Sequence, residues 1–266
     1  MNTNAINISS LAHVAPGCHL TSDAVIHDHA QVATQVVFGG DGIVVGQRAR
    51  LDAACVIAQG VEIGRGAWVR CGAVVLQSVP PNAVVQGNPA QVVGYTRSLV
   101  EGQEQGRVPR HVSYEDYAHL ERPSRIDLGV ANSALYMMRK VEEDARGSLT
   151  VGEVPTEVPF EPKRYFAVYD VPSSELRGEH AHKKCEQFLI CLHGSCRILL
   201  DNGRDLCEVT LSRPDMGVYM PAMVWGTQYR HSADAVLLVF ASRPYENDDY
   251  LRTYEEFLSE LNRVKS

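Results

Sequence analysis

The chain has 266 residues, 45% of them hydrophobic, and a formal net charge of −7 with no basic run. This length leaves room for one large domain or two ordinary ones, and the apolar content allows a packed core in each. The missing basic run argues against a nucleic-acid partner. No signal peptide or apolar stretch of membrane-spanning length is visible, so we expect a cytoplasmic protein with no membrane partner. Seven cysteines without a C-x-x-C pair indicate reduced thiols.

A six-residue repeat fills the first part of the chain. Twelve hexapeptides run from Ile8 to Val79, with one extra residue in the stretch 39–42. Two apolar tracks follow this period, and the first reads Ile8, Val14, Leu20, Ile26, Val32, Phe38, Val45, Leu51, Ile57, Ile63, Val69 and Val75. The second lies four positions later and holds Ala12, Cys18, Ala24, Ala30, Val36, Ala49, Cys55, Val61, Ala67, Ala73 and Val79. Hexapeptide periodicity is typical of a parallel β-helix, so residues 1–97 are predicted to form four coils.

The rest of the chain divides into a linker and a second all-β domain. Prolines between Pro80 and Pro89 are expected to stop the sheet ladders of the solenoid. Residues 98–125 are polar and read as a linker, with a short helix around 114–120. From 126 to 266, short apolar runs separated by turns predict an antiparallel barrel or jelly roll. A closing amphipathic helix follows the acids Asp248 and Asp249, and its apolar face is Tyr250, Tyr254, Phe257, Leu258 and Leu261.

The densest group of chemically active side chains lies in the second domain, between Arg177 and Gln187. On a strand, His180 and His182 face the same side, and Glu186 follows at the same parity. The pattern H-x-H-x-x-x-E is also the first metal motif of cupin barrels. However, the segment 220–226, where such sites place a further histidine, has none. We therefore expect no metal and favour proton transfer by two imidazoles, with solvent-facing histidines or a three-ligand metal site as the alternatives.

Residues 141–261 resemble the sugar-nucleotide 3,4-ketoisomerases, the cupins that act on dTDP-4-keto-6-deoxyglucose. The matching strings are RGSL at Arg146, PFEPKRYF at Pro159, RGEHAHKKCEQFLICLHGSCRILLDNG from Arg177, PAMVWG at Pro221 and DDYLRTYEEFL at Asp248. A departure is Gly226, where some of these enzymes have a histidine after the tryptophan. The resemblance implies a cupin fold and transfer of a ketone from C4 to C3 of the hexose through an enediol, in a deoxysugar pathway such as that of O-antigen.

The resemblance also implies residue roles. His180 and His182 become the proton shuttles, and we favour His180 as the base. Enediolate stabilisation or diphosphate binding is assigned to Arg177, Lys183 and Tyr165, with Tyr165 and Arg177 counted as catalytic. The remaining substrate-binding candidates are Arg164, Glu186, Tyr219 and Trp225. Tyr219 and Trp225 are equally compatible with a place in the core of the barrel.

The hexapeptide segment, up to the string VPPNAVVQGNPAQVVGY, resembles the left-handed β-helix acyltransferases. That resemblance implies a trimer with acetyl-CoA as co-substrate in the groove between neighbouring subunits. The expected acceptor is the amine of a dTDP-3-amino-3,6-dideoxyhexose. Four coils are few for such an enzyme, and His27 and His29 are the candidates for a catalytic histidine, with plain solvent-facing turn residues as the alternative. Three hypotheses result: a bifunctional enzyme, a ketoisomerase on a trimerising scaffold, or a metal-dependent cupin. The expected assembly is a trimer or a D3 hexamer.

Overall fold

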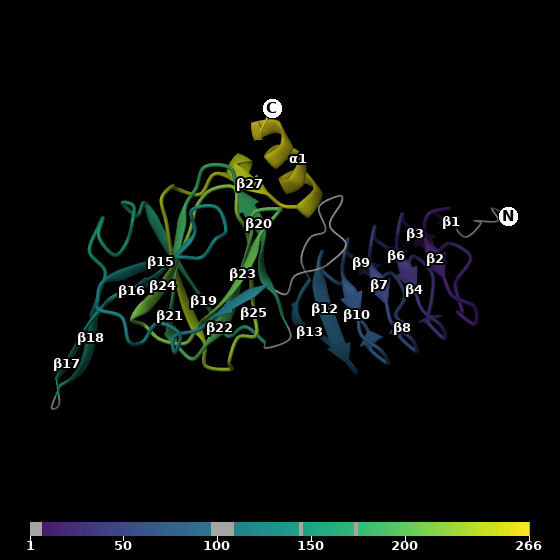
Figure 1. Ribbon diagram of the computed structural model, residues 1–266, viewed down its shortest axis with the longest axis horizontal. Coiled ribbons are helices and arrows are strands. Elements are labelled where there is room, and N and C mark those ends of the chain that lie inside the picture. The colour runs from purple at the N-terminus through teal and green to yellow at the C-terminus, as the bar shows by residue number, and fades with distance from the viewer. Residues whose placement is uncertain (1–6, 97–108, 144–145, 173–174, 266) are drawn as a thin grey trace. The chain divides into compact units, whose positions relative to one another are not determined.

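The computed structural model describes residues 7–96, 109–143, 146–172 and 175–265. The chain separates into two compact units, Met1–Val108 and Pro109–Ser266 (Figure 1). Within the described residues, no helix is both long enough and apolar enough to cross a membrane.

The first unit is a parallel β-helix of about four coils, as the repeat predicts (Figure 1). Its two-residue strands stack into three sheets in the orders β1-β3-β6-β9, β10-β7-β4-β2 and β11-β8-β5. The strands are β1 (Asn7–Ile8), β2 (His13–Val14), β3 (Val25–Ile26), β4 (Gln31–Val32), β5 (Val37–Phe38), β6 (Val44–Val45), β7 (Arg50–Leu51), β8 (Val56–Ile57), β9 (Glu62–Ile63), β10 (Trp68–Val69) and β11 (Val74–Val75).

The strand register confirms the single extra residue in the repeat. Asn7 pairs with Val25, one eighteen-residue coil later, whereas Val25 pairs with Val44, nineteen residues later. The coil that contains Gly39–Gly42 therefore absorbs the insertion, and the next coil returns to eighteen residues. Because the phase is restored, the second to fourth coils bury both apolar tracks, with Ile26, Leu51 and Val69 at 1% exposure or less.

The prediction that prolines end the sheet ladder at Val79 was wrong. Strand β12 (Ala83–Gly87) still pairs in parallel with β10, and β13 (Ala90–Tyr95) returns antiparallel to it. Pro80 and Pro81 lie before β12 and Pro89 lies in the turn before β13. No ladder N–H is lost at these positions, so the prolines are compatible with two further strands.

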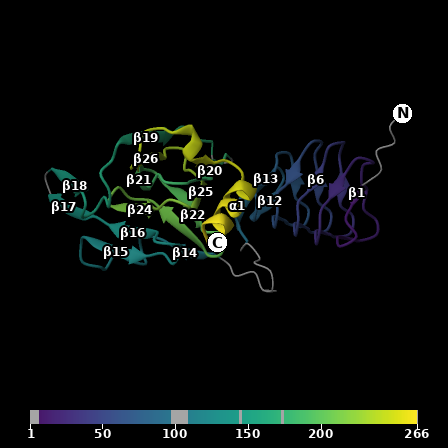
Figure 2. The same cartoon turned by 90° about the horizontal axis from the view of Figure 1, so that it is seen from above.

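The second unit is a barrel of two six-stranded sheets, seen from two sides in Figures 1 and 2. One sheet has the order β14-β23-β22-β25-β20-β27 and the other β15-β16-β24-β21-β26-β19. The strands are β14 (Arg110–Val112), β15 (Ser124–Asp127), β16 (Ala134–Met137), β19 (Arg164–Tyr169), β20 (Arg177–His182), β21 (Gln187–His193), β22 (Cys196–Asp201), β23 (Leu206–Leu211), β24 (Met216–Met220), β25 (Trp225–Tyr229), β26 (Val236–Ala241) and β27 (Tyr250–Leu251). A hairpin of β17 (Arg139–Glu143) and β18 (Gly147–Val151) extends from this barrel.

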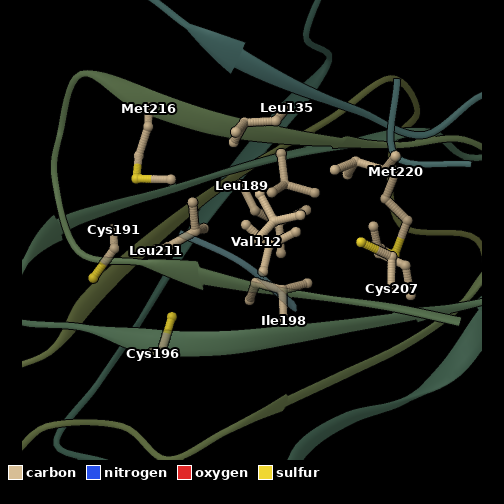
Figure 3. Close-up of a cluster of buried hydrophobic side chains, with 14 of the residues drawn as sticks. Val112, Leu135, Leu189, Cys191, Cys196, Ile198, Cys207, Leu211, Met216 and Met220 are labelled. Atoms are coloured by element: carbon tan, nitrogen blue, oxygen red, sulfur yellow. The ribbon is translucent and has the colours of Figure 1, made fainter. Parts of the chain in front are cut away.

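The core of the second unit fills the space between its two sheets. Leu135, Leu189 and Met220 come from one sheet and Ile198 and Leu211 from the other, and all are buried. Figure 3 shows these side chains pointing toward one another. This arrangement gives each strand an inner face, and candidate residues can share a site inside the barrel only if they lie on that face.

Part of the predicted linker belongs to the barrel. Strand β14 pairs in parallel with β23, and Val112 is buried in the core. Tyr114 and Tyr117 also pack against this core from a stretch that forms turns rather than the expected short helix. The apolar residues at 112, 114, 117, 118 and 120 follow neither a strand nor a clear helix period, so the pattern does not separate a short edge strand from a linker.

The C-terminal helix starts later than the sequence suggested. A 3₁₀ turn (Asn247–Asp249) and strand β27 precede the helix α1 (Tyr254–Lys265). Tyr254 and Phe257 of α1 pack on the barrel against Ala181 and Trp225. Tyr250, predicted for the apolar face of the helix, instead lies in β27 beside His182.

Candidate active site

The two histidines of the H-x-H motif meet on the inner face of β20. Their ring centroids are 5.1 Å apart, and Ala181 between them faces α1 on the other side of the sheet. A bulge precedes them: Gly178 pairs with Thr227 and His180 with Gly226, which leaves Glu179 as an extra residue. A Cβ on Gly178 would lie 2.6 Å from the Gly226 carbonyl oxygen, so the bulge requires glycine at 178.

His182 is buried and held at both ring nitrogens. Its Nδ1 lies 2.9 Å from Asp249 Oδ2, and its Nε2 lies 3.1 Å from the Gln187 side-chain nitrogen. Since the Gln187 amide donates, Nε2 accepts and Nδ1–H donates to the carboxylate. Burial lowers the pKa of His182 to about 4, helped by the neighbouring His180 and opposed by the bond to Asp249. The ring is therefore neutral at neutral pH.

Asp249 organises the turn that follows β20. Its carboxylate accepts from the backbone N–H groups of Lys184 (2.7 Å) and Cys185 (3.2 Å) as well as from His182. The carboxylate itself is buried. Three donors satisfy a buried charge that would otherwise be costly, so this residue fixes both the His182 ring and the chain beyond it.

His180 is held differently, in a way that leaves one nitrogen available. Its Nδ1 donates to the Gly178 carbonyl oxygen at 2.8 Å. In that tautomer Nε2 carries a lone pair, and no hydrogen bond to it occurs among the described residues. Burial lowers the pKa of His180, and the charge of Arg252 lowers it further. A general base must be neutral and must carry a lone pair that can accept a proton, and His180 Nε2 meets both conditions.

Arg164 brings a positive charge to the same side of the barrel. It shares the inner face of β19 with Phe166 and Val168, which pack against the core. Its Nε is buried without a hydrogen-bond partner in the described part of the chain, and its charge contributes to the lowered pKa of His182. A half-buried guanidinium whose Nε is buried and unsatisfied is suited to bind an anion that the protein itself does not supply.

Two of the sequence candidates, Tyr165 and Glu186, lie on the outer face of the barrel, away from the paired histidines. Tyr165 alternates with Arg164 on β19 and is 70% exposed. Glu186 accepts a hydrogen bond from the Tyr219 hydroxyl. Its expected parity with the histidines fails because β20 ends at His182 and the chain bends before β21 begins at Gln187.

Tyr219 and Trp225 also lie away from the paired histidines. Both pack against other apolar side chains, in line with the alternative that they are packing residues. Tyr219 packs with the cluster of Phe160 and Phe188 on the outer face of its sheet. Trp225 lies under α1, with its ring centroid 5.4 Å from that of Tyr254. Neither ring contacts His180 or His182 among the described residues, so neither is placed to stack on a substrate there.

The two remaining cationic candidates are exposed at the ends of β20. Arg177 opens the strand opposite Gln228, and Lys183 follows it with its Nζ 2.9 Å from the Asp248 carbonyl oxygen. Sequence reasoning missed Gln187, Asp249 and Tyr250 as site residues. The Tyr250 ring centroid lies 4.3 Å from that of His182 and 5.0 Å from that of His180. The signal for Asp249 and Tyr250 is the string DDYLRTYEEFL, and Gln187 ends the segment that begins at Arg177, but neither pattern shows that these side chains meet the histidines.

The arrangement does not assemble the three-ligand metal site considered from the sequence, because Glu186 bonds Tyr219 on the outer face. His182, Cys185 and Asp249 do lie within 4.8 Å of one another. However, Asp249 already accepts three hydrogen bonds, and burial raises the pKa of the Cys185 thiol, which disfavours the thiolate that binds metals. The donor set therefore fits a hydrogen-bonded histidine better than a metal.

In the β-helix unit, His27 and His29 lie in one exposed turn after β3. His29 has a φ of 59°, one residue before the inward Ala30, the same turn position that Gly60, Gly66 and Gly72 occupy in later coils. Asp28 between them accepts a hydrogen bond from Ser9 in the preceding coil. Both histidines are thus available to a ligand, and their chemical role remains a prediction.

The position of Tyr165 gives a first test. Replacing Tyr165 by phenylalanine is expected to change the kcat and KM of the reaction at this site by less than about twofold, because the hydroxyl is on the outer face of the barrel. Steady-state kinetics of the two proteins checks this. A tenfold or greater fall in kcat would show that Tyr165 is catalytic. It would also contradict the placement of Arg164, rather than Tyr165, on the inner face of β19.

The buried His182 predicts a pH-dependent stability. Its folded pKa of about 4 lies below the ordinary value of 6.5. As the pH falls below about 6.5 the unfolded chain takes up a proton that the folded chain does not, so stability is lost between about pH 6.5 and 4, by about 3 kcal/mol in total. Urea unfolding should therefore show a smaller loss from pH 7.5 to 4.5 in His182→Gln than in the wild type. Equal losses in both proteins would contradict the assignment.

Comparison with known proteins identifies the second unit. Residues 131–262 match the family model described as FdtA, WxcM-like, C-terminal. A TDP-4-oxo-6-deoxy-alpha-D-glucose-3,4-oxoisomerase from Aneurinibacillus thermoaerophilus is 42% identical over 121 residues, which cover 46% of this chain and 87% of that protein. The chain belongs to this oxoisomerase family.

A 3,4-ketoisomerase of known structure from Helicobacter canadensis is 38% identical to this family member, with a TM-score of 0.48 over 49% of this chain and 98% of that one. The QdtA 3,4-ketoisomerase from Thermoanaerobacterium thermosaccharolyticum, in complex with TDP, is 34% identical, with a TM-score of 0.48 over 50% of this chain and 97% of that one.

The first unit has different relatives. A serine acetyltransferase from Salmonella typhimurium is 37% identical over 87 residues, or 30% of this chain. The chain spans only 32% of the length of that enzyme. The similarity confirms the expected likeness of the hexapeptide segment to acetyltransferases, over a limited part of those proteins.

Proposed function

We propose that the barrel unit interconverts dTDP-4-keto-6-deoxyglucose and a dTDP-3-keto-6-deoxyhexose through an enediol. The observation that carries this proposal is the tautomer of His180, which leaves Nε2 unprotonated beside a second neutral histidine. Proton removal from a carbon next to a ketone needs a neutral base close to neutral pH. Membership of the oxoisomerase family supports the choice of substrate.

The proposed steps at carbon use the two histidines. His180 Nε2 takes the proton from C3, and the electrons of that bond form the C3–C4 double bond of the enediol. The proton then passes from His180 to His182 Nε2, and His182 as the second shuttle delivers it to C4, which leaves both histidines neutral again. The Nδ1–H bond to Asp249 favours a transient positive charge on His182, because the carboxylate faces it directly. Gln187 must release His182 Nε2 when substrate arrives.

The charged parts of the substrate require cations. We assign Arg164 to the enediolate oxygen or to the diphosphate, because its guanidinium is turned inward with a buried unsatisfied donor. Arg177 and Lys183, exposed at the two ends of β20, are separate candidates for the nucleotide diphosphate, because the strand holds them roughly 20 Å apart and one diphosphate cannot reach both. The sequence proposal that Arg177 is catalytic is thereby replaced by a binding role.

Product analysis by NMR with dTDP-4-keto-6-deoxyglucose tests the isomerase. The expected result is a new 3-keto signal and loss of the C3 proton signal in deuterated solvent. The proposal would be overturned if the substrate spectrum stayed unchanged at an enzyme concentration at which a known 3,4-ketoisomerase converts the same substrate. The configuration at C4 of the product, galacto or gluco, follows from the same spectrum.

We propose a second activity for the β-helix unit, N-acetylation of a dTDP-3-amino-3,6-dideoxyhexose with acetyl-CoA. The likeness of this segment to serine acetyltransferases supports acetyl transfer, and the exposed His27 and His29 are the candidate bases. Incubation with both substrates, followed by mass spectrometry, should give a product heavier by one acetyl group. If no acetylated product forms, the unit is the trimerisation scaffold of the alternative hypothesis.

We also propose that the protein is a cytoplasmic homo-oligomer, a trimer through the β-helix units or a D3 hexamer if the barrels also pair. Native mass spectrometry distinguishes the two states. A monomer would contradict both and would leave the acetyl-CoA groove between subunits unformed.

A further inference from the structure

Isomerisation also moves a proton between oxygens, and the histidines do not account for this step. The ketone oxygen at C4 must gain a proton, and the hydroxyl at C3 must lose one. A neutral hydroxyl is suited to both tasks, because it can donate to one oxygen and accept from the other. This reasoning rests on the proposed isomerase function.

Tyr250 places a hydroxyl-bearing ring against both histidines. It pairs with His182 across the β20–β27 ladder and faces the same side of the sheet. Its ring is half-buried, and its centroid lies 4.3 Å from that of His182 and 5.0 Å from that of His180. No hydrogen bond of the Tyr250 hydroxyl occurs among the residues that the structure describes, so the group is available to a ligand.

The ring is also fixed in place. The Arg252 guanidinium carbon lies 4.5 Å from the Tyr250 centroid, and the Tyr245 centroid lies 5.5 Å away. The preceding residue, Asp249, is anchored by its three hydrogen bonds. A group held on several sides is positioned without further ordering when the substrate binds, which is what catalysis requires.

The other tyrosines near this part of the barrel are less suitable. Tyr165 lies on the outer face, and the Tyr219 hydroxyl donates to Glu186. Phe166, the inward aromatic residue of β19, has no hydroxyl. Within the described residues, Tyr250 is the tyrosine whose ring contacts the two imidazoles.

We propose that the Tyr250 hydroxyl relays the proton between the two substrate oxygens. As His180 breaks the C3–H bond, the C3–C4 double bond forms, the electrons of the C4 carbonyl move to its oxygen, and Tyr250 protonates that oxygen. The phenolate then takes the proton of the C3 hydroxyl as the C3 carbonyl forms and C4 accepts a proton from the protonated histidine. Tyr250 and the histidines end as they began, so the scheme needs no external oxidant or reductant.

Replacing Tyr250 by phenylalanine tests the relay, because it keeps the ring and removes only the hydroxyl. The expected result is a fall in kcat on the order of 100-fold, with KM and the Kd for dTDP, measured by calorimetry, changed less than about twofold. Tyr169→Phe, which removes a hydroxyl from the exposed face of β19, is the matched control and should retain full activity.

The outcomes separate the relay from simpler explanations. If Tyr250→Phe keeps wild-type kcat while Tyr250→Leu loses activity, the ring only supports the imidazoles and the relay is wrong. A Phe variant that no longer binds dTDP or melts at a lower temperature also contradicts a role confined to the hydroxyl. If the wild-type protein binds dTDP but does not isomerise the ketosugar, the proposed function fails, and the relay fails with it.

Discussion

Replacing His180 by asparagine is expected to reduce isomerisation on the order of 1,000-fold, the loss typical of removing a general base. Asparagine is the informative substitution, because its amide can still donate to the Gly178 carbonyl oxygen as Nδ1 does at 2.8 Å. The lone pair at Nε2 is lost, and the bulge and the His182 network remain. Exchange of the substrate C3 proton with deuterated solvent, followed by NMR, should fall in parallel with kcat.

The control for this experiment is His193→Asn at the end of β21. His193 is exposed and pairs with Asp234, away from the inner face of the barrel, so its replacement should leave exchange unchanged. Retention of normal C3 exchange in His180→Asn would show that His180 is not the base. If exchange were then lost in His182→Asn, the dyad of His182 and Asp249 would take that role.

The β-helix was largely predictable from the sequence because its period records its geometry. Every hexapeptide repeats the same two inward positions, so one misread residue does not displace the next coil. The offset from eighteen to nineteen residues between Asn7–Val25 and Val25–Val44 was readable as a single insertion. Where the period ended, the prediction failed: β12 and β13 extend the sheet although prolines flank them.

The barrel was harder to predict from the sequence. Alternation along a strand shows which residues share a face, but not which of the two faces points into the barrel. In the string Lys163-Arg164-Tyr165-Phe166, both parities contain an aromatic residue, and chemistry suggested Tyr165 as the site residue. Packing decides otherwise: Phe166 and Val168 join the core, so Arg164 is inward and Tyr165 outward. His180 and His182 were placed together correctly because parity holds within one continuous strand.

The partners of the histidines could not be predicted from local pattern. Asp249 is 67 residues from His182 in the chain, and the contact depends on β27 pairing with β20. The acids at 248 and 249 precede a helix, where carboxylates commonly act as caps. Only the tertiary fold shows that Asp249 turns inward while Asp248 stays exposed.

Replacing Asp249 by asparagine is expected to lower both stability and activity, because one carboxylate oxygen becomes an amide donor. Oδ2 accepts from His182 and Cys185, and Oδ1 accepts from the Lys184 N–H. Whichever way the amide turns, at least one buried donor faces another donor. The expected cost is about 2 to 4 kcal/mol in the free energy of unfolding, measured by urea denaturation.

The activity of Asp249→Asn should fall on the order of 100-fold or more even at a temperature where the variant is fully folded, because the His182 ring loses the group that sets its tautomer. Asp248→Asn is the matched control, since the side chain of Asp248 is exposed and only its backbone carbonyl is used, by Lys183. A variant with wild-type kcat and lowered stability would show that Asp249 only anchors the turn after β20. A loss of kcat with KM unchanged would instead place the His182–Asp249 pair in the proton transfer itself, since binding of the nucleotide depends on other residues.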